Sequence, residues 1–321
     1  MIAFIFPGQG SQAVGMGKAL AEAFPEARAA FAEADAAFAA AAGGPDDGRP
    51  SLRQLCFEGP EDQLTLTEHT QPAILAASIA GARVLGAHGI HPTLVAGHSL
   101  GEYSANVAAG TFGFADAIGI VRRRGRYMQE AVPPGAGAMA AILGLEAADV
   151  RRACDEAAEG EVVSPANINS PGQIVIAGAA GAVRRAGERA RALGARRVVP
   201  LAVSAPFHCA LMKPAERRLE PELRALATSD PRVPIVANVD GQPKRDARAA
   251  IDALVRQVSA PVLWEDVVRR LASDGVTTYV EVGPGRVLGG LVKKIHTEAR
   301  VLAFAAPGDL DAILSDVRSL R

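Results

Sequence analysis

A single pentapeptide, Gly97-His98-Ser99-Leu100-Gly101, constrains the fold of this chain more than any other segment. It follows the apolar run Thr93–Gly97, which has the pattern of a short buried strand, and a helical pattern begins at Ser99 or Leu100. A serine on such a sharp turn forces the strand and the helix together two positions before and two positions after it, where only very small side chains fit. The two glycines meet that requirement. The sequence therefore predicts a strand-turn-helix unit of the nucleophile-elbow type inside an α/β fold.

This turn would place the hydroxyl of Ser99 near the N-terminus of the helix that follows. There the backbone N–H of Leu100 is positioned to donate a hydrogen bond to a developing oxyanion. A glycine-rich turn with an N-capping serine would give the same sequence pattern. The motif alone therefore leaves both a catalytic and a structural serine open.

A serine hydroxyl is a weak nucleophile unless a general base, most often histidine, lies beside it. Among the six histidines, we favour His208, because it follows the predicted strand Arg197–Val203 and precedes a helix, where α/β active sites are assembled. His98 is expected to point away from Ser99. Position alone favours a catalytic role for His208 no more than a packed structural one. No Asp or Glu between Ser99 and His208 stands out as a third member of a triad, so another group must orient the imidazole.

One arginine falls on the apolar side of a predicted helix, Phe114–Val132. At 100° per residue, the apolar stripe of this helix consists of Ala117, Val121, Gly125, Met128 and Ala131. Arg124 lies within that stripe, whereas Arg122, Arg123 and Arg126 lie opposite. A buried charge costs several kcal/mol unless it is paired, so a carboxylate of the protein or of a substrate should meet Arg124. An arginine that snorkels past the edge of the helix remains an equal alternative.

The rest of the chain predicts two sheets. Residues 138–203 read as strand, helix, strand, strand, helix, strand, which is the order of a ferredoxin-like unit. On either side of it, the predicted strands Ile2–Phe6, Thr93–Gly97, Val233–Val239, Thr278–Val282 and Val301–Ala305 alternate with helices, as in a parallel α/β sheet. The smaller unit is thus predicted to be inserted into the larger, with residues 1–133 and 205–321 forming one domain and 134–204 the other. Gly43–Pro50 is predicted to be a polar surface loop.

Composition excludes several classes of function. The 321 residues are 49% hydrophobic, enough for a large core. A formal net charge of -1 and a pI near 6.6 provide no general field for nucleic acid or an anionic membrane. Three widely spaced cysteines form no CxxC pair and fit a reducing cytoplasm. Ile2–Phe6 is too short for the apolar region of a signal peptide, and charged residues and glycines interrupt the longest apolar stretch, so no membrane segment is predicted.

Several separate segments, in this order, make the chain resemble the malonyl-CoA:acyl carrier protein transacylase family, which is shared with the acyltransferase domains of fatty acid and polyketide synthases. The resemblance covers nearly the whole chain. Its segments are Phe6–Gln12, Gly97–Tyr103, Arg124-Gly125 with Met128-Gln129, Asn167–Gln173, the residues around His208, Gln257 with Pro261–Trp264, and Glu281–Gly285.

The resemblance implies roles that the residues alone leave open. A backbone carbonyl near Gln257 would orient His208, which explains the missing acidic triad member. The backbone N–H of Gln9 would be a second oxyanion donor beside that of Leu100, and Arg124 would bind the free carboxylate of malonate. The fold implied is an α/β-hydrolase-like domain with the ferredoxin-like insert as the other wall of the cleft.

The activity implied is transfer of malonyl from coenzyme A to the phosphopantetheine thiol of acyl carrier protein in the cytoplasm, through a Ser99 ester, without metal or other cofactor. Phe207 resembles the bulky residue of malonyl-selective members. Fatty acid synthesis is the expected pathway, with polyketide synthesis as the alternative. Basic residues of the insert are expected to meet an acidic carrier protein; these are Arg184, Arg185, Arg189 and Arg196.

Three rival functions are weighed against this one. A serine thioester hydrolase shares the serine and the histidine, but it has less need of an arginine, such as Arg124, that binds malonate. A nucleotide-binding protein is disfavoured because Gln12 stands where a phosphate-binding loop needs glycine and Ala19 where it needs Ser or Thr. A non-catalytic docking module for carrier protein would not be expected to retain Ser99, His208 and Arg124 together.

Overall fold

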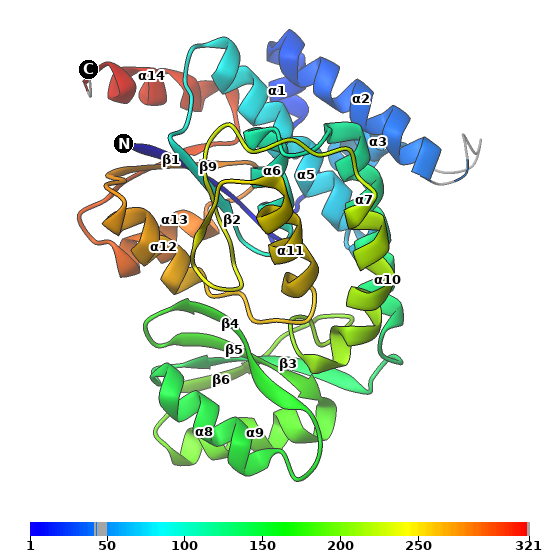
Figure 1. Ribbon diagram of the computed structural model, residues 1–321, viewed down its shortest axis with the longest axis vertical. Coiled ribbons are helices and arrows are strands. Elements are labelled where there is room, and N and C mark those ends of the chain that lie inside the picture. The colour runs from blue at the N-terminus through cyan, green and yellow to red at the C-terminus, as the bar shows by residue number, and fades with distance from the viewer. Residues whose placement is uncertain (42, 44–49, 320–321) are drawn as a thin grey trace.

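The computed structural model describes residues 1–41, 43 and 50–319, and its larger part is built on a six-stranded sheet (Figure 1). The strand order is β10-β9-β1-β2-β7-β8. All neighbouring strands pair in parallel except β7 and β8, which pair antiparallel. The strands are β1 (Ile2–Phe6), β2 (Leu94–Gly97), β7 (Ile235–Val236), β8 (Pro243–Lys244), β9 (Thr278–Val282) and β10 (Arg300–Phe304).

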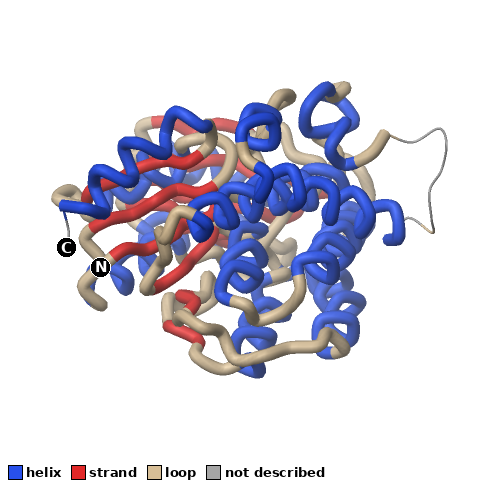
Figure 2. Tube along the Cα trace, turned by 90° about the horizontal axis from the view of Figure 1, so that it is seen from above, coloured by secondary structure: helices blue, strands red, loops and turns tan. Residues whose placement is uncertain are grey.

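Helices lie on both sides of these strands, as Figure 2 shows. Alternate residues of β1 face opposite cores, because successive side chains of a strand point to opposite faces. Phe4 and Phe6 belong to the core shared with α2, α5 and α7, whereas Ala3 and Ile5 belong to the core shared with α12 and α13. The helices of this larger part are α1 (Lys18–Ala23), α2 (Pro25–Ala41), α3 (Leu52–Glu58), α4 (Glu61–Leu64), α5 (Thr67–Ala87), α6 (Leu100–Ala109), α7 (Phe114–Glu130), α10 (Lys213–Arg224), α11 (Ala247–Gln257), α12 (Trp264–Ser273), α13 (Val287–Ile295) and α14 (Leu310–Ser319).

A four-stranded antiparallel sheet of order β4-β5-β3-β6 forms the second part of the molecule. Its strands and helices are β3 (Gly137–Leu143), α8 (Ala147–Ala157), β4 (Val163–Ser170), β5 (Gln173–Ala179), α9 (Ala180–Ala192) and β6 (Arg197–Pro200). Ile142 and Ile176 face α8 and α9, which lie on the outer side of this sheet in Figure 1. Met139 and Val175 instead join the large core on the inner side.

The predicted order of strands and helices in both sheets is confirmed, with three corrections. β7 covers only Ile235–Val236 rather than 233–239, because Pro234 has no N–H to donate and residues 238–240 form a turn. β6 ends at Pro200 rather than 203, since the chain then leaves the sheet to line a pocket. β8 makes the large sheet mixed rather than purely parallel. The predicted loop at 43–50 lies mostly outside the described residues.

None of the helices in the described ranges has the length and apolar character needed to span a bilayer.

Candidate active site

Ser99 sits at the sharp turn between β2 and α6, with φ 51° and ψ -105°. Positive φ is strained for any residue with a side chain, and such strain persists only where the surroundings enforce it. A Cβ on Gly97 would lie 1.9 Å from the carbonyl carbon of Gly101, and a Cβ on Gly101 would lie 2.0 Å from Phe6 O. These distances confirm the predicted steric role of the two glycines.

The side chain of Asn238, two residues after the end of β7, ties the two sides of this turn together. Its Oδ1 accepts a hydrogen bond from Ser99 N at 2.8 Å, and its Nδ2 donates to Gly97 O at 2.7 Å. Sequence reasoning missed Asn238. A polar amide within the otherwise apolar predicted strand 233–239 was the available signal.

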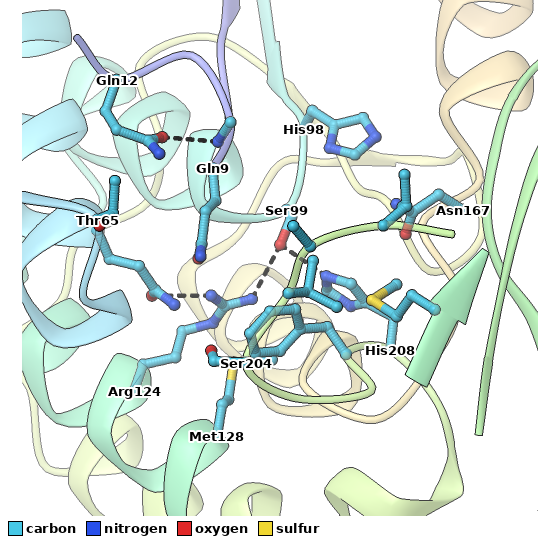
Figure 3. Close-up of a pocket in the computed structure, with 17 residues that line it drawn as sticks. Gln9, Gln12, Thr65, His98, Ser99, Arg124, Met128, Asn167, Ser204 and His208 are labelled. Carbon is cyan, nitrogen blue, oxygen red and sulfur yellow. Dashed lines mark hydrogen bonds between the residues drawn. The ribbon is translucent and has the colours of Figure 1, made fainter. Parts of the chain in front are cut away.

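His208 lies directly beside the serine, with its Nε2 2.7 Å from Ser99 Oγ (Figure 3). Its Nδ1 is 2.9 Å from the backbone carbonyl oxygen of Gln257. Because a carbonyl only accepts hydrogen bonds, Nδ1 carries the ring proton, and the neutral imidazole leaves Nε2 free to accept the serine proton. His208 is itself at φ 60°, so both partners of this contact have strained backbones.

Burial, and after it the positive charge of Arg124, lowers the pKa of His208 from 6.5 to about 3. The imidazole is therefore neutral at pH 7, which is the state that a general base requires. His208 does not lie directly between a strand and a helix as predicted. It follows the segment 201–207, which leaves β6, and it precedes the short helix Ala210–Met212 and then α10.

Arg124 points into the protein from α7 and is 1% exposed, as its place in the apolar stripe predicts. Its Nη1 donates to Gln71 Oε1 at 2.8 Å, while its Nη2 donates to Gln257 Oε1 at 2.8 Å and to Ser99 Oγ at 3.2 Å. All three acceptors are neutral oxygens. The protein therefore does not supply the carboxylate expected for Arg124 at hydrogen-bonding distance.

A pocket of about 400 Å³ opens above Ser99, His208 and Arg124, and both sheets contribute to its lining. Met139 comes from β3, and Leu201 and Phe207 from the segment after β6. Gln9 lines the pocket from the loop after β1, with its side-chain Nε2 donating to Thr67 Oγ1. Leu100 is the first residue of α6, so its N–H lies at a helix N-terminus, where N–H groups have no intrahelical partner.

His98 turns away from Ser99, as predicted (Figure 3). Its Nε2 is 2.9 Å from Asn169 Oδ1, and its ring lies 5.7 Å from that of Trp264. Within the described part of the chain, no three or more His, Cys, Asp or Glu side chains gather in a way that could hold a metal ion.

Two of the arginines expected to meet a carrier protein are already engaged within the four-stranded sheet and its helices. Arg185 forms ion pairs with Glu159 and Glu161, and Arg189 pairs with Glu156. Both arginines lie on α9, on the side of the sheet away from the pocket. Arg184 and Arg196 are exposed. The structure therefore does not favour Arg185 and Arg189 as docking residues.

Comparison with known proteins gives a family and a set of close relatives. The acyl transferase domain family matches residues 3–305. The malonyl CoA-acyl carrier protein transacylase of Salmonella typhimurium is 51% identical over 314 residues, which cover 98% of each chain. That of Bacillus subtilis is 45% identical over 318 residues, covering 99% of this chain and 97% of the relative.

Solved structures agree with these sequence matches over nearly the full length. An acyl carrier protein S-malonyltransferase from Vibrio cholerae superposes with a TM-score of 0.92 at 47% identity, covering 97% of this chain and 99% of the other. A malonyl-transacylase solved in complex with a type II polyketide synthase acyl carrier protein also has a TM-score of 0.92 at 47% identity, with 98% and 99% covered. The α/β fold is therefore shared with structures of malonyl-transferring proteins.

Proposed function

Since this chain belongs to the acyl transferase domain family, we propose that it transfers malonyl from malonyl-CoA to the phosphopantetheine thiol of acyl carrier protein through an ester on Ser99. One observation carries the proposal: Ser99 Oγ lies 2.7 Å from His208 Nε2 and 3.2 Å from Arg124 Nη2 in one pocket. The base and the cation for the far end of the acyl group thus both lie beside the nucleophilic oxygen.

In the first half-reaction, Ser99 Oγ attacks the thioester carbonyl carbon of malonyl-CoA while its proton passes to His208 Nε2. The carbonyl of Gln257 stabilises the imidazolium that forms, since it accepts from Nδ1. The oxyanion is held by the backbone N–H groups of Leu100 and Gln9. When the C–S bond breaks, the coenzyme A thiolate leaves and takes the proton from His208, and malonyl remains as an ester on Ser99.

In the second half-reaction, the thiol of the carrier protein's phosphopantetheine enters the same pocket and gives its proton to His208. Its sulfur attacks the ester carbonyl, the C–O bond to Ser99 breaks, and His208 returns the proton to Ser99 Oγ. Because one site serves both substrates in turn, the kinetics are ping-pong. Every step uses side chains and backbone groups of this chain, without a cofactor.

Arg124 binds the malonyl carboxylate in this proposal. Its present acceptors are neutral oxygens, so a carboxylate entering the pocket provides the missing opposite charge. A charge-assisted pair is stronger than a neutral hydrogen bond. Malonyl-CoA is therefore preferred over acetyl-CoA, which has no group for Arg124.

We also infer that residues 134–204 form a ferredoxin-like domain inserted into an α/β-hydrolase-like domain formed by residues 1–133 and 205–321. The order β4-β5-β3-β6 with two helices on one face supports the first assignment. A mostly parallel sheet in which β2 ends at a serine elbow supports the second.

We place the protein in the cytoplasm, as a supplier of malonyl units for fatty acid synthesis. All three cysteines are free and buried, which fits a reducing compartment. The relative solved with a polyketide synthase carrier protein favours polyketide synthesis as a second destination. Transfer assays with one carrier protein of each kind distinguish the two pathways.

Intact-protein mass spectrometry tests the proposed chemistry directly. Wild-type protein mixed with malonyl-CoA, without carrier protein, should gain one malonyl group, and Ser99→Ala should gain none. Addition of carrier protein should then remove the group from the wild type. The proposal fails if wild type forms no adduct, or if the adduct persists in Ser99→Ala.

A further inference from the structure

The carboxylate of Glu102 is buried beneath the active site and belongs to neither the serine-histidine pair nor the pocket lining. Glu102 lies in the first turn of α6, three residues after Ser99, and is 1% exposed. Its Oε2 accepts hydrogen bonds from Gln257 Nε2 at 2.8 Å and from Asn238 N at 3.1 Å. It therefore contacts the two residues that hold His208 and the serine turn.

The contacts of Gln257 fix the orientation of its side-chain amide. Nε2 donates to Glu102 Oε2 and to Ser99 O, both at 2.8 Å, while Oε1 accepts from Arg124 Nη2 at 2.8 Å. A rotated amide would set its oxygen against a carboxylate and a carbonyl, and its NH₂ group against the guanidinium. Glu102 thus holds the oxygen of Gln257 toward Arg124.

Gln257 serves the two halves of the active site through different atoms. Its backbone carbonyl accepts from His208 Nδ1, whereas its side chain accepts from Arg124. Rotation of the side-chain amide would leave the backbone contact in place. A change at Glu102 should therefore affect Arg124 more than His208.

Glu102 also supplies negative charge for Arg124 through this amide. The partners of the two Nη atoms are neutral. Burial lowers the pKa of Arg124, and the negative charge of Glu102 acts in the opposite direction. The reciprocal influence is present, since Arg124 lowers the pKa of Glu102. A guanidinium held in this way stays charged and directed at Ser99 before substrate arrives.

We propose that Glu102 is a positioning residue for acyl selectivity, which through Gln257 keeps Arg124 placed to receive a substrate carboxylate. This inference rests on the proposed function and adds a determinant outside the pocket. Substrate does not touch Glu102, so its effect appears in the choice between malonyl and acetyl rather than in the acyl-transfer chemistry common to both.

The test compares rates of acyl-enzyme formation from malonyl-CoA and acetyl-CoA in wild type and in Glu102→Gln, which has nearly the same shape without the charge. The malonyl-to-acetyl ratio of kcat/KM should fall at least about tenfold, the scale of a hydrogen bond to a charged group, while the acetyl rate stays within about threefold. In an Arg124→Ala background, Glu102→Gln should leave the ratio unchanged. An unchanged ratio in the single variant, whether or not both rates fall, overturns the proposal.

Glu281→Gln is the matched control. Glu281 is also a buried carboxylate, and it accepts hydrogen bonds from Leu288 N and Gly289 N at the start of α13. Its loss should leave the malonyl-to-acetyl ratio as in wild type. A similar fall in ratio would mean that any buried carboxylate produces the effect, which also overturns the proposal.

A pH series on wild type provides a second measurement that needs no folded variant. Burial is the main reason that the pKa of Glu102 is raised to about 7. The charge of Asp240 also raises this pKa, whereas that of Arg124 lowers it. Tyr103 is the other titratable group beside Glu102. Both substrates share coenzyme A and His208, so other titrations cancel in the ratio. The malonyl-to-acetyl ratio should fall about fivefold from pH 8 to pH 6 in wild type and stay flat in Arg124→Ala.

A flat wild-type ratio over this range contradicts the proposal. Failure of wild type to form any malonyl-Ser99 ester would instead refute the proposed function, so the two ideas fail on different observations.

Discussion

The two sides of the pocket are built differently. The floor, formed by Ser99, His208 and Arg124 with Gln257 and Glu102 beneath them, is held by hydrogen bonds, and each of these side chains has at least one partner within 3.2 Å. The opposite wall includes Leu201 and Val203, which are 36% and 37% exposed. The floor has charge and strained backbone, whereas these wall residues offer apolar surface to solvent.

This difference separates two tasks. Buried polar groups give large effects when one partner is removed, because the group left behind is unsatisfied. Removing an apolar side chain that is about one-third exposed gives a small effect, because little of its surface leaves water when a ligand binds. The floor should therefore determine which acyl group reacts, and the wall should adjust how well the ligand fits.

The largest effect should come from Arg124→Ala in the floor. Loss of a buried charged partner costs about 2–5 kcal/mol, so kcat/KM for malonyl-CoA should fall about thirtyfold to several thousandfold. Acetyl-CoA should be much less affected. Steady-state assays with both thioesters measure this directly.

Arg126→Ala is its control, since Arg126 lies on the same helix, half-exposed, with Glu130 3.9 Å away. That variant should keep both activities within about twofold, as for an exposed ion pair. Preserved malonyl preference in Arg124→Ala would break the contrast between floor and wall, because Arg124 would then be structural.

A smaller effect is expected from the burial of His208, in the pH dependence of stability. The folded-state pKa is lowered to about 3 from 6.5, so between these values the unfolded chain binds a proton that the folded chain does not. Stability from this group is thus lost as the pH falls below 6.5. At pH 5 the loss is about 2 kcal/mol.

The measurement is the free energy of unfolding of wild type and His208→Gln at pH 7 and pH 5. The difference between them should shift by about 2 kcal/mol in favour of the variant at pH 5. Ser99→Ala retains His208 and should follow wild type. A difference that does not change with pH would mean that the floor is open to water.

The smallest effect should come from the wall. Leu201→Ala removes a side chain that is already one-third exposed, so KM for malonyl-CoA should rise only about threefold with kcat unchanged. Val14→Ala, which also removes an exposed apolar group but one outside the pocket lining, should change neither constant. A loss in kcat for Leu201→Ala comparable to that of Arg124→Ala would show that the wall also carries the chemistry.

Local patterns were sufficient to predict much of this architecture. The elbow at Ser99 follows from glycines that have no room for a Cβ. The inward direction of Arg124 follows from helical periodicity. These features depend on neighbours within a few residues in the chain, which is why sequence reasoning reaches them.

Other parts depend on contacts between distant segments. Asn238 lies 139 residues from Ser99, and Gln257 lies 155 residues from Glu102, so no local pattern joins them. The signal that singled out Arg124, a polar residue among the apolar residues of a helix face, also applies to Gln71 in α5 and Glu102 in α6. Helix α11 was not predicted, although it delivers Gln257 to His208.

The segment that enters the four-stranded sheet and the segment that follows it lie against each other. A Cβ on Gly137 at the start of β3 would lie 2.4 Å from Pro206 Cγ, only two residues before His208. The backbone that enters β3 therefore packs directly against the segment that carries His208. A side chain larger than that of glycine at position 137 would push Pro206 out of place and, through it, the imidazole beside the nucleophile.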